Sequence, residues 1–409
     1  MSSATTLADL KCFVAEIMKE RAITKYEIHI EGHSGRGENY LGEVTFFSVT
    51  TSNNGRRYDM VMKTAKRSEE LRKTMAVESA YRRESLMYSK VIPEIERFLE
   101  DANCGVKVVK IDFVPKIFWI CDEENRETLI MENLKARGFR HWNRRRPMDM
   151  NHALFILKHL GEYHATTMAM KVLKPKTFDK FARTMNGIWQ EFMEKIDGNT
   201  LFVSNLRNAV RCLEEKGNKE LADKFKAVED KVGDIIYGEI PVEDRLVITH
   251  GDCWINNILL GYEDENSSTP SKICFVDFQL SSYDTPIKDL SYFIYTACDK
   301  TLLDDFDLLL RNYHTSLSEN LEALGCNVDD ILPYPQLMEH WKRYANFGLI
   351  LSTMVVKVEL LDSDEAPDIT EISETGADFA ETFNRKIKNE EGYERRMLDV
   401  LTHFGRKFL

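Results

Sequence analysis

The sequence lacks several patterns that mark other classes of protein. Its eight cysteines are scattered along 409 residues without a Cys-x-x-Cys pair, so they predict neither a zinc site nor a disulfide framework. Its longest apolar run, residues 349–356, is broken by Ser352 and Thr353 and is far shorter than the roughly 20 residues that a membrane helix needs. No internal repeat or low-complexity tract occurs. These absences favour a globular chain with reduced core thiols and no membrane span.

Positive charge is also in short supply. The 55 Lys and Arg residues are outnumbered by 67 Asp and Glu residues, which gives a formal net charge of -12. Such a balance argues against nonspecific nucleic-acid binding, which needs clustered cations, and any phosphate ligand must therefore meet a local basic pocket. The first 24 residues mix charged and apolar side chains and lack the continuous apolar core of a signal peptide. We expect a cytoplasmic protein, and no pattern indicates its oligomeric state.

The residues that are present divide the chain into two parts. Apolar residues make up 43% and charged residues 30% of the sequence, as in globular proteins. A helix is predicted at residues 67–90, and beyond residue 154 the apolar residues recur mainly at helical spacing. Strands are predicted at residues 26–31, 44–50, 58–62, 115–120 and 128–131. The pattern therefore predicts an α+β protein with a small strand-containing lobe, residues 1–133, and a larger, mainly helical lobe, residues 134–409.

Two segments of the helical part are strongly charged. Residues 362–378 hold seven carboxylates and no Lys or Arg, and because like charges repel, we expect a solvated loop there. Residues 135–146 hold six Lys or Arg residues around Trp142 and no acid. A patch that binds phosphate or RNA is one interpretation of this basic stretch. A solvated lip is the interpretation that the acidic composition of the whole chain favours.

Two short apolar strands are each followed by an aspartate. The first strand, residues 246–249, runs into the turn 250–257, which carries Asp252 and Asn257. The second strand, residues 273–276, is followed by Asp277. Phosphoryl transfer needs one carboxylate to position the attacking hydroxyl and accept its proton, and a second one to hold Mg²⁺ together with an amide oxygen. Asp, Asn and Gly also favour ordinary turns. The occurrence of both segments in this order favours phosphoryl transfer.

The upstream half of the chain offers residues that could bind phosphate. Lys63 closes an apolar strand, where an ammonium group needs a partner or a ligand. Glu84 lies on the same helical stripe as Val77 and offers that partner. A glycine-rich turn at residues 32–40 could cover triphosphate oxygens with backbone N–H groups, although it matches neither the Walker spacing nor GxGxxG. An exposed lysine, a solvated glutamate and a plain hairpin turn are the alternatives.

Taken together, these residues resemble the protein-kinase-like superfamily and, within it, the choline/aminoglycoside kinase branch. The sequence is most similar to the ecdysteroid kinase-like (CHK kinase-like) family of arthropods, whose HGDxWxxN pattern matches residues 250–257. The likeness includes Gly-Glu-Asn-Tyr at residues 37–40, Glu-Asn-Leu at 132–134 and Asp-Phe-Gln at 277–279. It covers nearly the whole chain in the same order.

The resemblance implies a bilobal kinase-like fold that binds ATP and Mg²⁺ between its lobes. It implies that Asp252 is the catalytic residue and that Asn257 and Asp277 are the metal ligands. It also implies that His250 and Asp289 support the catalytic loop, although Asp289 could equally be a helix N-cap. The cofactor-binding residues that it implies are Ser34, Gly35, Gly37, Glu38, Asn39, Lys63, Glu84, Glu132, Asn133 and Leu134.

Two departures from protein kinases bear on the substrate. Gln279 stands where protein kinases carry glycine, and only about a dozen residues separate Asp277 from Asp289, without an Ala-Pro-Glu signature. No room is left for a long activation loop or a platform that grips a peptide. We expect a small hydroxylated acceptor in a pocket formed partly by residues 154–243; the resemblance implies an ecdysteroid-like steroid or a hydroxylated xenobiotic. A choline/ethanolamine-type kinase and a nucleotide-binding pseudokinase or scaffold are the alternatives.

Overall fold

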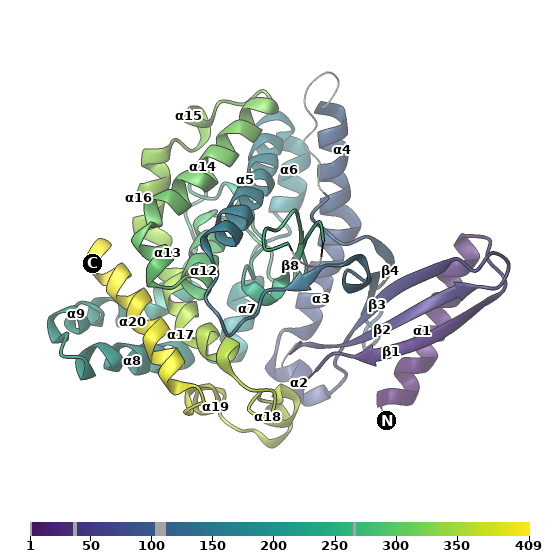
Figure 1. Ribbon diagram of the computed structural model, residues 1–409, viewed down its shortest axis with the longest axis horizontal. Helices are drawn as coiled ribbons and strands as arrows, with labels where there is room; N and C mark the ends of the chain where they lie inside the picture. The colour runs from purple at the N-terminus through teal and green to yellow at the C-terminus, as the bar shows by residue number, and fades with distance from the viewer. Residues whose placement is uncertain (1, 36–38, 103–111, 265–266) are drawn as a thin grey trace.

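A five-stranded antiparallel sheet forms the centre of the N-terminal lobe, with the strands in the order β1-β2-β3-β5-β4. The computed structural model describes residues 2–35, 39–102, 112–264 and 267–409, and its sheet lies beside a larger helical lobe (Figure 1). The strands are β1 (Tyr26–His33), β2 (Gly42–Thr51), β3 (Arg57–Ala65), β4 (Ile117–Cys121) and β5 (Thr128–Glu132). The strands predicted from the sequence, and the α+β bilobal architecture, are confirmed.

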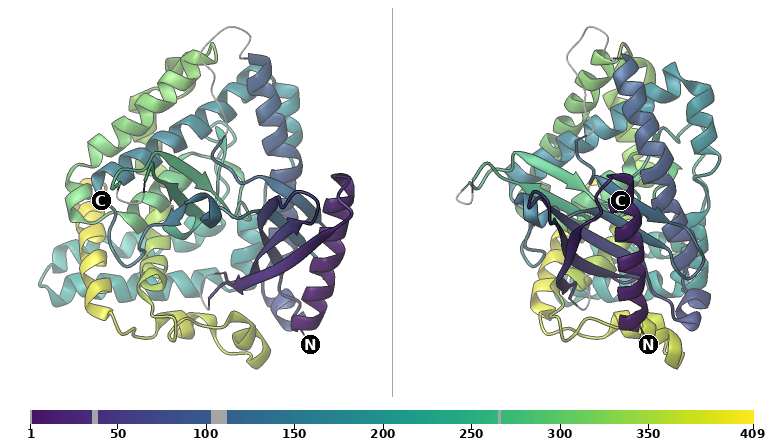
Figure 2. Two further views of the ribbon diagram at one scale, coloured as in Figure 1. Left: turned by 45° about the vertical axis from the view of Figure 1, so that its right-hand side comes forward. Right: turned by 90° about the vertical axis from the view of Figure 1, so that its right-hand side faces the viewer.

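The two faces of this sheet have different neighbours. Helix α1 (Ser2–Glu20) lies along the outer face (Figure 2), where its apolar residues form a separate core with strand residues such as Met60 and Met62. Because side chains alternate along a strand, Val61 and Lys63 point to the opposite face and line a cavity beside the helical lobe. The sheet thus places Lys63 between the lobes.

The helix predicted at residues 67–90 is interrupted. It consists of α2 (Glu69–Thr74), α3 (Val77–Leu86) and the π-helical turn η1 (Met87–Val91), which continues into α4 (Ile92–Ala102). The break lies at Met75, whose backbone is extended. Beyond it, the predicted stripe is buried as a whole, and it includes Tyr81, Glu84 and Tyr88. Helix α3 therefore turns the Glu84 carboxylate toward the core.

The C-terminal lobe is built on two closely packed helix pairs, α5 with α14 and α12 with α17. The α12–α17 contact depends on Gly348, where a Cβ atom would lie 2.1 Å from the backbone carbon of Ser291. The helices of this lobe are η2 (Lys135–Arg137), α5 (Met150–Leu173), α6 (Pro175–Ala182), α7 (Ile188–Lys195), α8 (Gly198–Glu215), α9 (Lys219–Lys224), α10 (Lys226–Glu229), α11 (Val232–Tyr237), η3 (Ile255–Asn257), α12 (Ile287–Ala297), α13 (Lys300–Asp304), α14 (Phe306–Ala323), α15 (Val328–Ile331), α16 (Tyr334–Tyr344), α17 (Asn346–Leu360), α18 (Ile369–Thr375), α19 (Phe379–Asn384) and α20 (Glu390–Lys407). In the part of the chain that the structure describes, no helix has both the length and the apolar character needed to cross a bilayer.

Two small sheets carry the loops that face the N-terminal lobe. One contains β6 (Arg140–His141), β8 (Ile258–Gly261) and β9 (Lys272–Phe275), and the other pairs β7 (Val247–Ile248) with β10 (Tyr283–Asp284). The segment between β7 and β8 holds the turn 250–257. The segment that follows β9 holds Asp277. Because β8 and β9 are antiparallel neighbours, the two segments lie side by side.

The acidic segment is not the solvated loop that its charge predicted. Its carboxylates are exposed or half-buried, but Ile369 and Ile372 are buried in helix α18. We call residues 362–384 the strap, because they connect the two lobes (Figure 1). On the N-terminal lobe, Thr74 of α2 donates a 2.8 Å hydrogen bond to Ser373. On the helical lobe, α19 packs against α8. Repulsion between the carboxylates is relieved by solvent and by ion pairs with Arg145 and Lys388, while the apolar residues between them fold inward.

Candidate functional site

A single buried carboxylate holds the turn that follows β7. Asp289, in the first turn of α12, accepts hydrogen bonds from the backbone N–H groups of His250 at 2.7 Å and Gly251 at 2.9 Å. Gly251 has φ of +87°, and a Cβ atom there would lie 2.1 Å from the Leu280 carbonyl oxygen, so only glycine fits this turn. The N-cap of α12 is Pro286. The N-cap alternative for Asp289 is therefore wrong, and its side chain contacts the loop.

Two histidines, His164 and His250, lie close to the Asp289 carboxylate. The Nε2 atom of His164 lies 3.1 Å from Asp289 Oδ2, and its Nδ1 atom lies 2.9 Å from the hydroxyl oxygen of Tyr313. Burial by itself raises the pKa of Asp289, but the hydrogen bond and the nearby charge of His164 outweigh it and lower this pKa. The Nε2 atom of His250 lies 3.0 Å from the Val276 carbonyl oxygen, and burial lowers the pKa of His250. His250 thus joins the backbone of the two loops, whereas His164 holds the Asp289 carboxylate.

Asp252 lies in the turn 250–257, and both of its carboxylate oxygens accept hydrogen bonds. Its Oδ1 atom accepts a hydrogen bond from the Tyr292 hydroxyl at 3.0 Å, and its Oδ2 atom accepts one from the Asn257 amide at 2.8 Å. These two bonds fix the orientation of the carboxylate, which is half-buried. Burial, and then the negative charge of Asp277, raise the pKa of Asp252 to about 7. A carboxylate with this pKa is suited to accept a proton near neutral pH.

A buried ionic cluster connects the two lobes. The Lys63 ammonium lies 2.7 Å from Glu84 Oε2 and 2.8 Å from Asp277 Oδ1. The Gln279 amide can bridge the same groups, with its oxygen 3.3 Å from Lys63 Nζ and its nitrogen 3.1 Å from Asp277 Oδ1. Burial lowers the pKa of Lys63, but the two carboxylates outweigh it and raise this pKa. Burial also raises the pKa of Glu84 to about 7, although Lys63 opposes this shift.

The Asp277 side chain reaches Lys63 from a strained backbone. Its φ of +68° lies in the left-handed region, which is uncommon for residues other than glycine and costs free energy. The neighbouring Phe278 is buried, and its ring centroid lies 4.5 Å from that of His250 and 5.7 Å from that of Tyr88. Packing of this ring opposes relaxation of the turn. The unusual conformation aims the carboxylate into the space between the lobes.

Most of the residues predicted to bind the cofactor line one cavity of about 500 Å³. Its walls include apolar side chains of β2, β3 and β8 and of the segment that follows β9. The predicted residues that line it are Ser34, Gly35, Asn39, Lys63, Glu84, Glu132, Asn133, Leu134, Asn257 and Asp277. Gly37 and Glu38 lie outside the described residues. The sequence thus predicted the members of a single cavity from positions more than 200 residues apart.

Residues 132–134 begin at the last residue of β5 and form the connection between the lobes. The backbone N–H of Glu132 donates to the Lys116 carbonyl, and the Glu132 side chain accepts the Lys116 N–H at 2.8 Å. The N–H of Asn133 donates to the Asp59 carbonyl, while its side chain accepts from the N–H of Lys135 at 3.1 Å. These bonds hold the connection rigidly against the sheet beside the cavity.

The interpretation of residues 135–146 as a solvated lip is incomplete. Lys135, Arg144 and Arg145 line the same cavity as Lys63. The Arg144 guanidinium is half-buried and donates to the carbonyl oxygens of Val358 and Leu361 at 3.3 and 3.2 Å. In the sequence, the cluster of cations without an acid indicated a basic patch at residues 135–146. It could not show which of these side chains face the cavity.

A second, apolar cavity of about 190 Å³ adjoins the first. Asp252 lines it, and Asn39, Asn257 and Asp277 line both cavities. Its remaining walls come from several distant elements. The main contributors are Trp189, Phe192 and Met193 of α7 and Ile196, which caps it, Leu201 and Phe202 of α8, Leu351, Met354, Val355 and Val358 of α17, and Ile369, Phe379 and Phe383 of the strap. Part of this wall was predicted from residues 154–243, whereas the contribution of the strap was not predicted.

The donor set at the junction of the cavities fits Mg²⁺ bound together with a phosphate ligand. Among the described residues, no three His, Cys, Asp or Glu side chains gather as a complete metal site. Asn257 and Asp277 supply one amide oxygen and one carboxylate that both face the shared space. Mg²⁺ commonly takes one or two protein oxygens and completes its shell with phosphate oxygens and water.

Comparison with known proteins identifies the family. A family model described as the ecdysteroid kinase-like family matches residues 36–326, a span that includes Lys63, Glu84, Asp252, Asn257 and Asp277. No match was found among curated proteins. The matched span covers well over half of the 409 residues. The chain belongs to the ecdysteroid kinase-like family.

Proposed function

We propose that the chain is an ATP- and Mg²⁺-dependent kinase that phosphorylates a hydroxyl group of a small, neutral, lipophilic molecule. The observation that carries the proposal is the position of Asp252, which lines the apolar cavity and is hydrogen-bonded to Asn257, a residue that lines both this cavity and the polar cavity with Lys63. Family membership supports a phosphotransferase with a kinase-like fold. The acceptor class, an ecdysteroid-like steroid or a hydroxylated xenobiotic, is the finer part of the proposal.

The polar cavity has the groups that the nucleotide requires. Lys63 would contact the phosphates of ATP, and Asn257 and Asp277 would hold the metal. Bound Mg²⁺ would supply positive charge to the phosphate oxygens. Apolar side chains such as Val44, Phe46 and Met131 line the same cavity next to residues 132–134, where a flat base would find apolar contact.

Asp252 would position the acceptor hydroxyl and take its proton. As the hydroxyl oxygen forms a bond to the γ-phosphorus of ATP, the bond from that phosphorus to the β–γ bridging oxygen breaks, and ADP leaves with the electron pair. The proton of the hydroxyl passes to Asp252. Because Tyr292 and Asn257 already hold this carboxylate, little reorganisation accompanies the step, and positioning supplies much of the rate enhancement.

The composition of the second cavity supports a neutral acceptor. Among the described residues, Asp252 and Asp277 are the acids that line it, and no Lys or Arg does so. Both acids already have partners, so they are not free to pair with a charged acceptor. The aromatic rings of its wall could also surround a quaternary ammonium group, which retains a choline-type acceptor as the second candidate. A volume of about 190 Å³ is below the roughly 300–1,000 Å³ of pockets for drug-sized ligands. An acceptor of steroid size therefore requires the cavity to widen.

Incubation with Mg²⁺, ATP and a panel of acceptors tests the proposal. The panel contains ecdysteroids, hydroxylated plant and drug metabolites, choline and ethanolamine, and mass spectrometry detects the gain of one phosphate. We expect a product from a neutral lipophilic alcohol. Phosphorylation of choline or ethanolamine alone would instead establish the alternative acceptor class. Mg²⁺-dependent thermal stabilisation by ATP, with no turnover of any acceptor, would indicate a pseudokinase or scaffold.

A further inference from the structure

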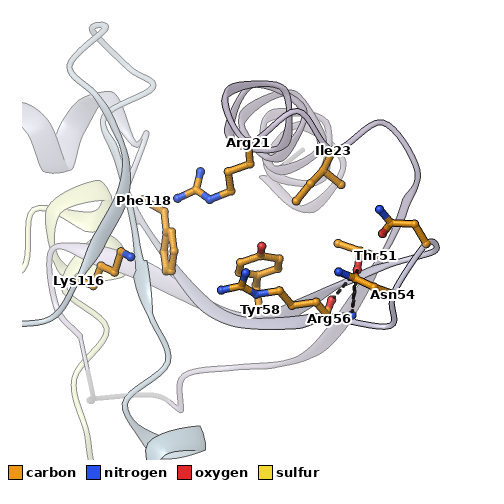
Figure 3. A pocket seen from close by; sticks show the side chains of 9 residues that line it. Arg21, Ile23, Thr51, Asn54, Arg56, Tyr58, Lys116 and Phe118 are labelled. Carbon is orange, nitrogen blue, oxygen red and sulfur yellow. Dashed lines mark hydrogen bonds between the residues drawn. The ribbon is translucent and has the colours of Figure 1, made fainter.

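The outer face of the N-terminal lobe carries a basic hollow that the proposed reaction does not use. It has a volume of about 410 Å³ and lies between the end of α1, the β2–β3 turn and β4 (Figure 3). The residues that line it are Arg21, Ile23, Thr51, Asn53, Asn54, Arg56, Tyr58, Lys116 and Phe118. Tyr58 and Phe118 pack with the core under α1. The hollow is therefore on the face of the sheet opposite to Lys63.

Three cations meet in this hollow without a countercharge. In the described ranges, no carboxylate forms an ion pair with Arg21, Arg56 or Lys116, and none lines the hollow. The neighbouring Arg57 shows the usual arrangement in this acidic chain, because it pairs with Glu31 and Asp59. Like charges that converge in a concave space repel one another and raise the local positive potential. An anion bound among them would relieve this repulsion.

Aromatic rings position these cations. The Arg21 guanidinium carbon lies 5.3 Å and the Lys116 ammonium 5.7 Å from the centroid of the Phe118 ring, and the Arg56 guanidinium carbon lies 4.9 Å from that of Tyr58. In Figure 3 the Arg21 guanidinium lies near the Phe118 ring, and the Arg56 guanidinium lies near the Tyr58 ring. Stacking on a ring leaves the N–H groups at the edge of a guanidinium free to donate. The hollow thus combines charge-assisted donors with apolar surface.

We propose that this hollow is a second binding site, for a small organic anion in which a phosphate or sulfate group adjoins an aromatic or other apolar body. The phosphate or sulfate lies between Arg21, Arg56 and Lys116, and the apolar body lies against Tyr58, Phe118 and Ile23. The opposite face of the sheet holds the nucleotide cavity, so both sites can be occupied together. This assignment is independent of the proposed kinase reaction, since it uses none of the residues between the lobes.

Isothermal titration of the full chain with 1-naphthyl phosphate tests the assignment, with 1-naphthol as the uncharged probe. Each titration is made on the protein alone and on the protein saturated with Mg²⁺ and a non-hydrolysable ATP analogue. We expect saturable binding of 1-naphthyl phosphate in both states and much weaker binding of 1-naphthol. Loss of all binding in the presence of the analogue would place the probe in the nucleotide cavity and overturn the assignment. Equal affinity for 1-naphthol would overturn it as well.

A double variant, Arg56→Gln with Lys116→Gln, removes two of the cations. Both side chains are exposed, whereas Arg21 donates to the Ile17 carbonyl at 2.9 Å and is left in place. We expect the affinity for 1-naphthyl phosphate to fall by about tenfold or more, because two charge-assisted hydrogen bonds to the phosphate group are lost.

The matched control removes the same charge from the same lobe. Lys19→Gln with Arg57→Gln alters two cations that already pair with carboxylates outside the hollow, and we expect a change of less than about twofold. Equal weakening in the two double variants would reduce the binding to general electrostatic attraction and overturn the site. Unchanged melting temperatures verify that both variants fold.

Discussion

The two cavities between the lobes are built in opposite ways. The cavity proposed to bind the nucleotide, which we call the nucleotide cavity, holds charged and amide side chains, and Lys63, Glu84 and Asp277 form one ionic cluster inside it. The cavity proposed to bind the acceptor, which we call the acceptor cavity, is mainly aromatic and aliphatic and is enclosed by α7, α8, α17 and the strap. They share Asn39, Asn257 and Asp277 at their junction. These three residues therefore lie between a cavity that can bind its ligand through charged groups and a cavity that can bind its ligand through apolar contact.

This difference indicates which parts of the molecule constrain the chemistry and which select the acceptor. Charged groups with fixed geometry accept few substitutions, because an unpaired buried charge is costly. An apolar wall tolerates changes of hydrophobic residue as long as its volume is kept. We therefore expect substitutions in the nucleotide cavity to abolish turnover, and substitutions in the acceptor cavity to change which molecule is phosphorylated.

The largest effect is expected for Asp252→Asn. The amide keeps the shape of the side chain but cannot accept a proton, so kcat should fall by about 10²- to 10⁴-fold. The affinity for ATP, measured by calorimetry, should stay within a few-fold of the wild type, because Asp252 lines the acceptor cavity. Asp330→Asn, an exposed site on α15, is the matched control. Wild-type turnover in purified Asp252→Asn would remove this residue from the mechanism.

Lys63→Met should affect both stability and activity. It leaves the fully buried Glu84 without its cation, and breaking a buried ion pair in this way costs about 3–5 kcal/mol of unfolding free energy. Urea unfolding measures the loss, and steady-state kinetics should show little residual turnover.

A second substitution separates the two roles of Lys63. Adding Glu84→Gln to Lys63→Met removes the uncompensated carboxylate, so we expect the double variant to recover most of the stability and none of the activity. Recovery of turnover along with stability would mean that Lys63 serves only the fold.

How far each cavity could be predicted from the sequence depends on the kind of residues that line it. The residues of the nucleotide cavity lie in short, distinctive segments, such as the turn 250–257 and residues 277–279, in which residue type and spacing already limit the chemistry. Their mutual positions were inferred from the order of strands and from a family resemblance. What could not be predicted was the conformation of Asp277, whose positive φ is maintained by the packing of Phe278 against distant rings.

No short, distinctive sequence segment marks the acceptor cavity. Its wall uses ordinary apolar positions of helices, where Phe379 or Val355 looks the same in sequence whether it faces a core or a cavity. The strap was misjudged for a related reason. The seven carboxylates of residues 362–378 determined the prediction of a solvated loop. The isoleucines between them instead determine the fold, and they lie on α18, which packs against α2, far away in the sequence.

Phe379→Ala tests whether the strap contributes to acceptor selection. The half-buried ring lines the acceptor cavity and stacks beside Phe383 at 6.5 Å between centroids. Loss of a partly buried ring contact costs about 1–2 kcal/mol, so kcat/KM for the best acceptor should fall by about tenfold. The KM for ATP should not change. Leu308→Ala, on the exposed side of α14, is the control. A change in the KM for ATP with an unchanged acceptor KM would contradict the division between the cavities.

The smallest effect concerns the helical support behind the acceptor cavity. Helix α20 packs against α17 and carries His403 among the rings of Phe306, Tyr295 and Phe408. Burial, and then the positive charge of Lys407, lower the pKa of His403 to about 4, against the opposing charges of Asp304 and Asp307. The folded state thus keeps this imidazole neutral where the unfolded chain would bind a proton.

His403 should therefore make the helical lobe sensitive to acid. A depressed pKa in the folded state means that its contribution to stability is complete above pH 6.5 and is lost as the pH falls from 6.5 toward about 4. Between pH 7 and pH 5 the unfolding free energy of the wild type should fall by about 1 kcal/mol more than that of His403→Phe, since the partly accessible ring feels less than the full shift. Urea unfolding at both pH values measures the difference. Parallel losses in the two proteins would mean that His403 is protonated in the folded state, and that acid weakens the acceptor side of the molecule through other groups.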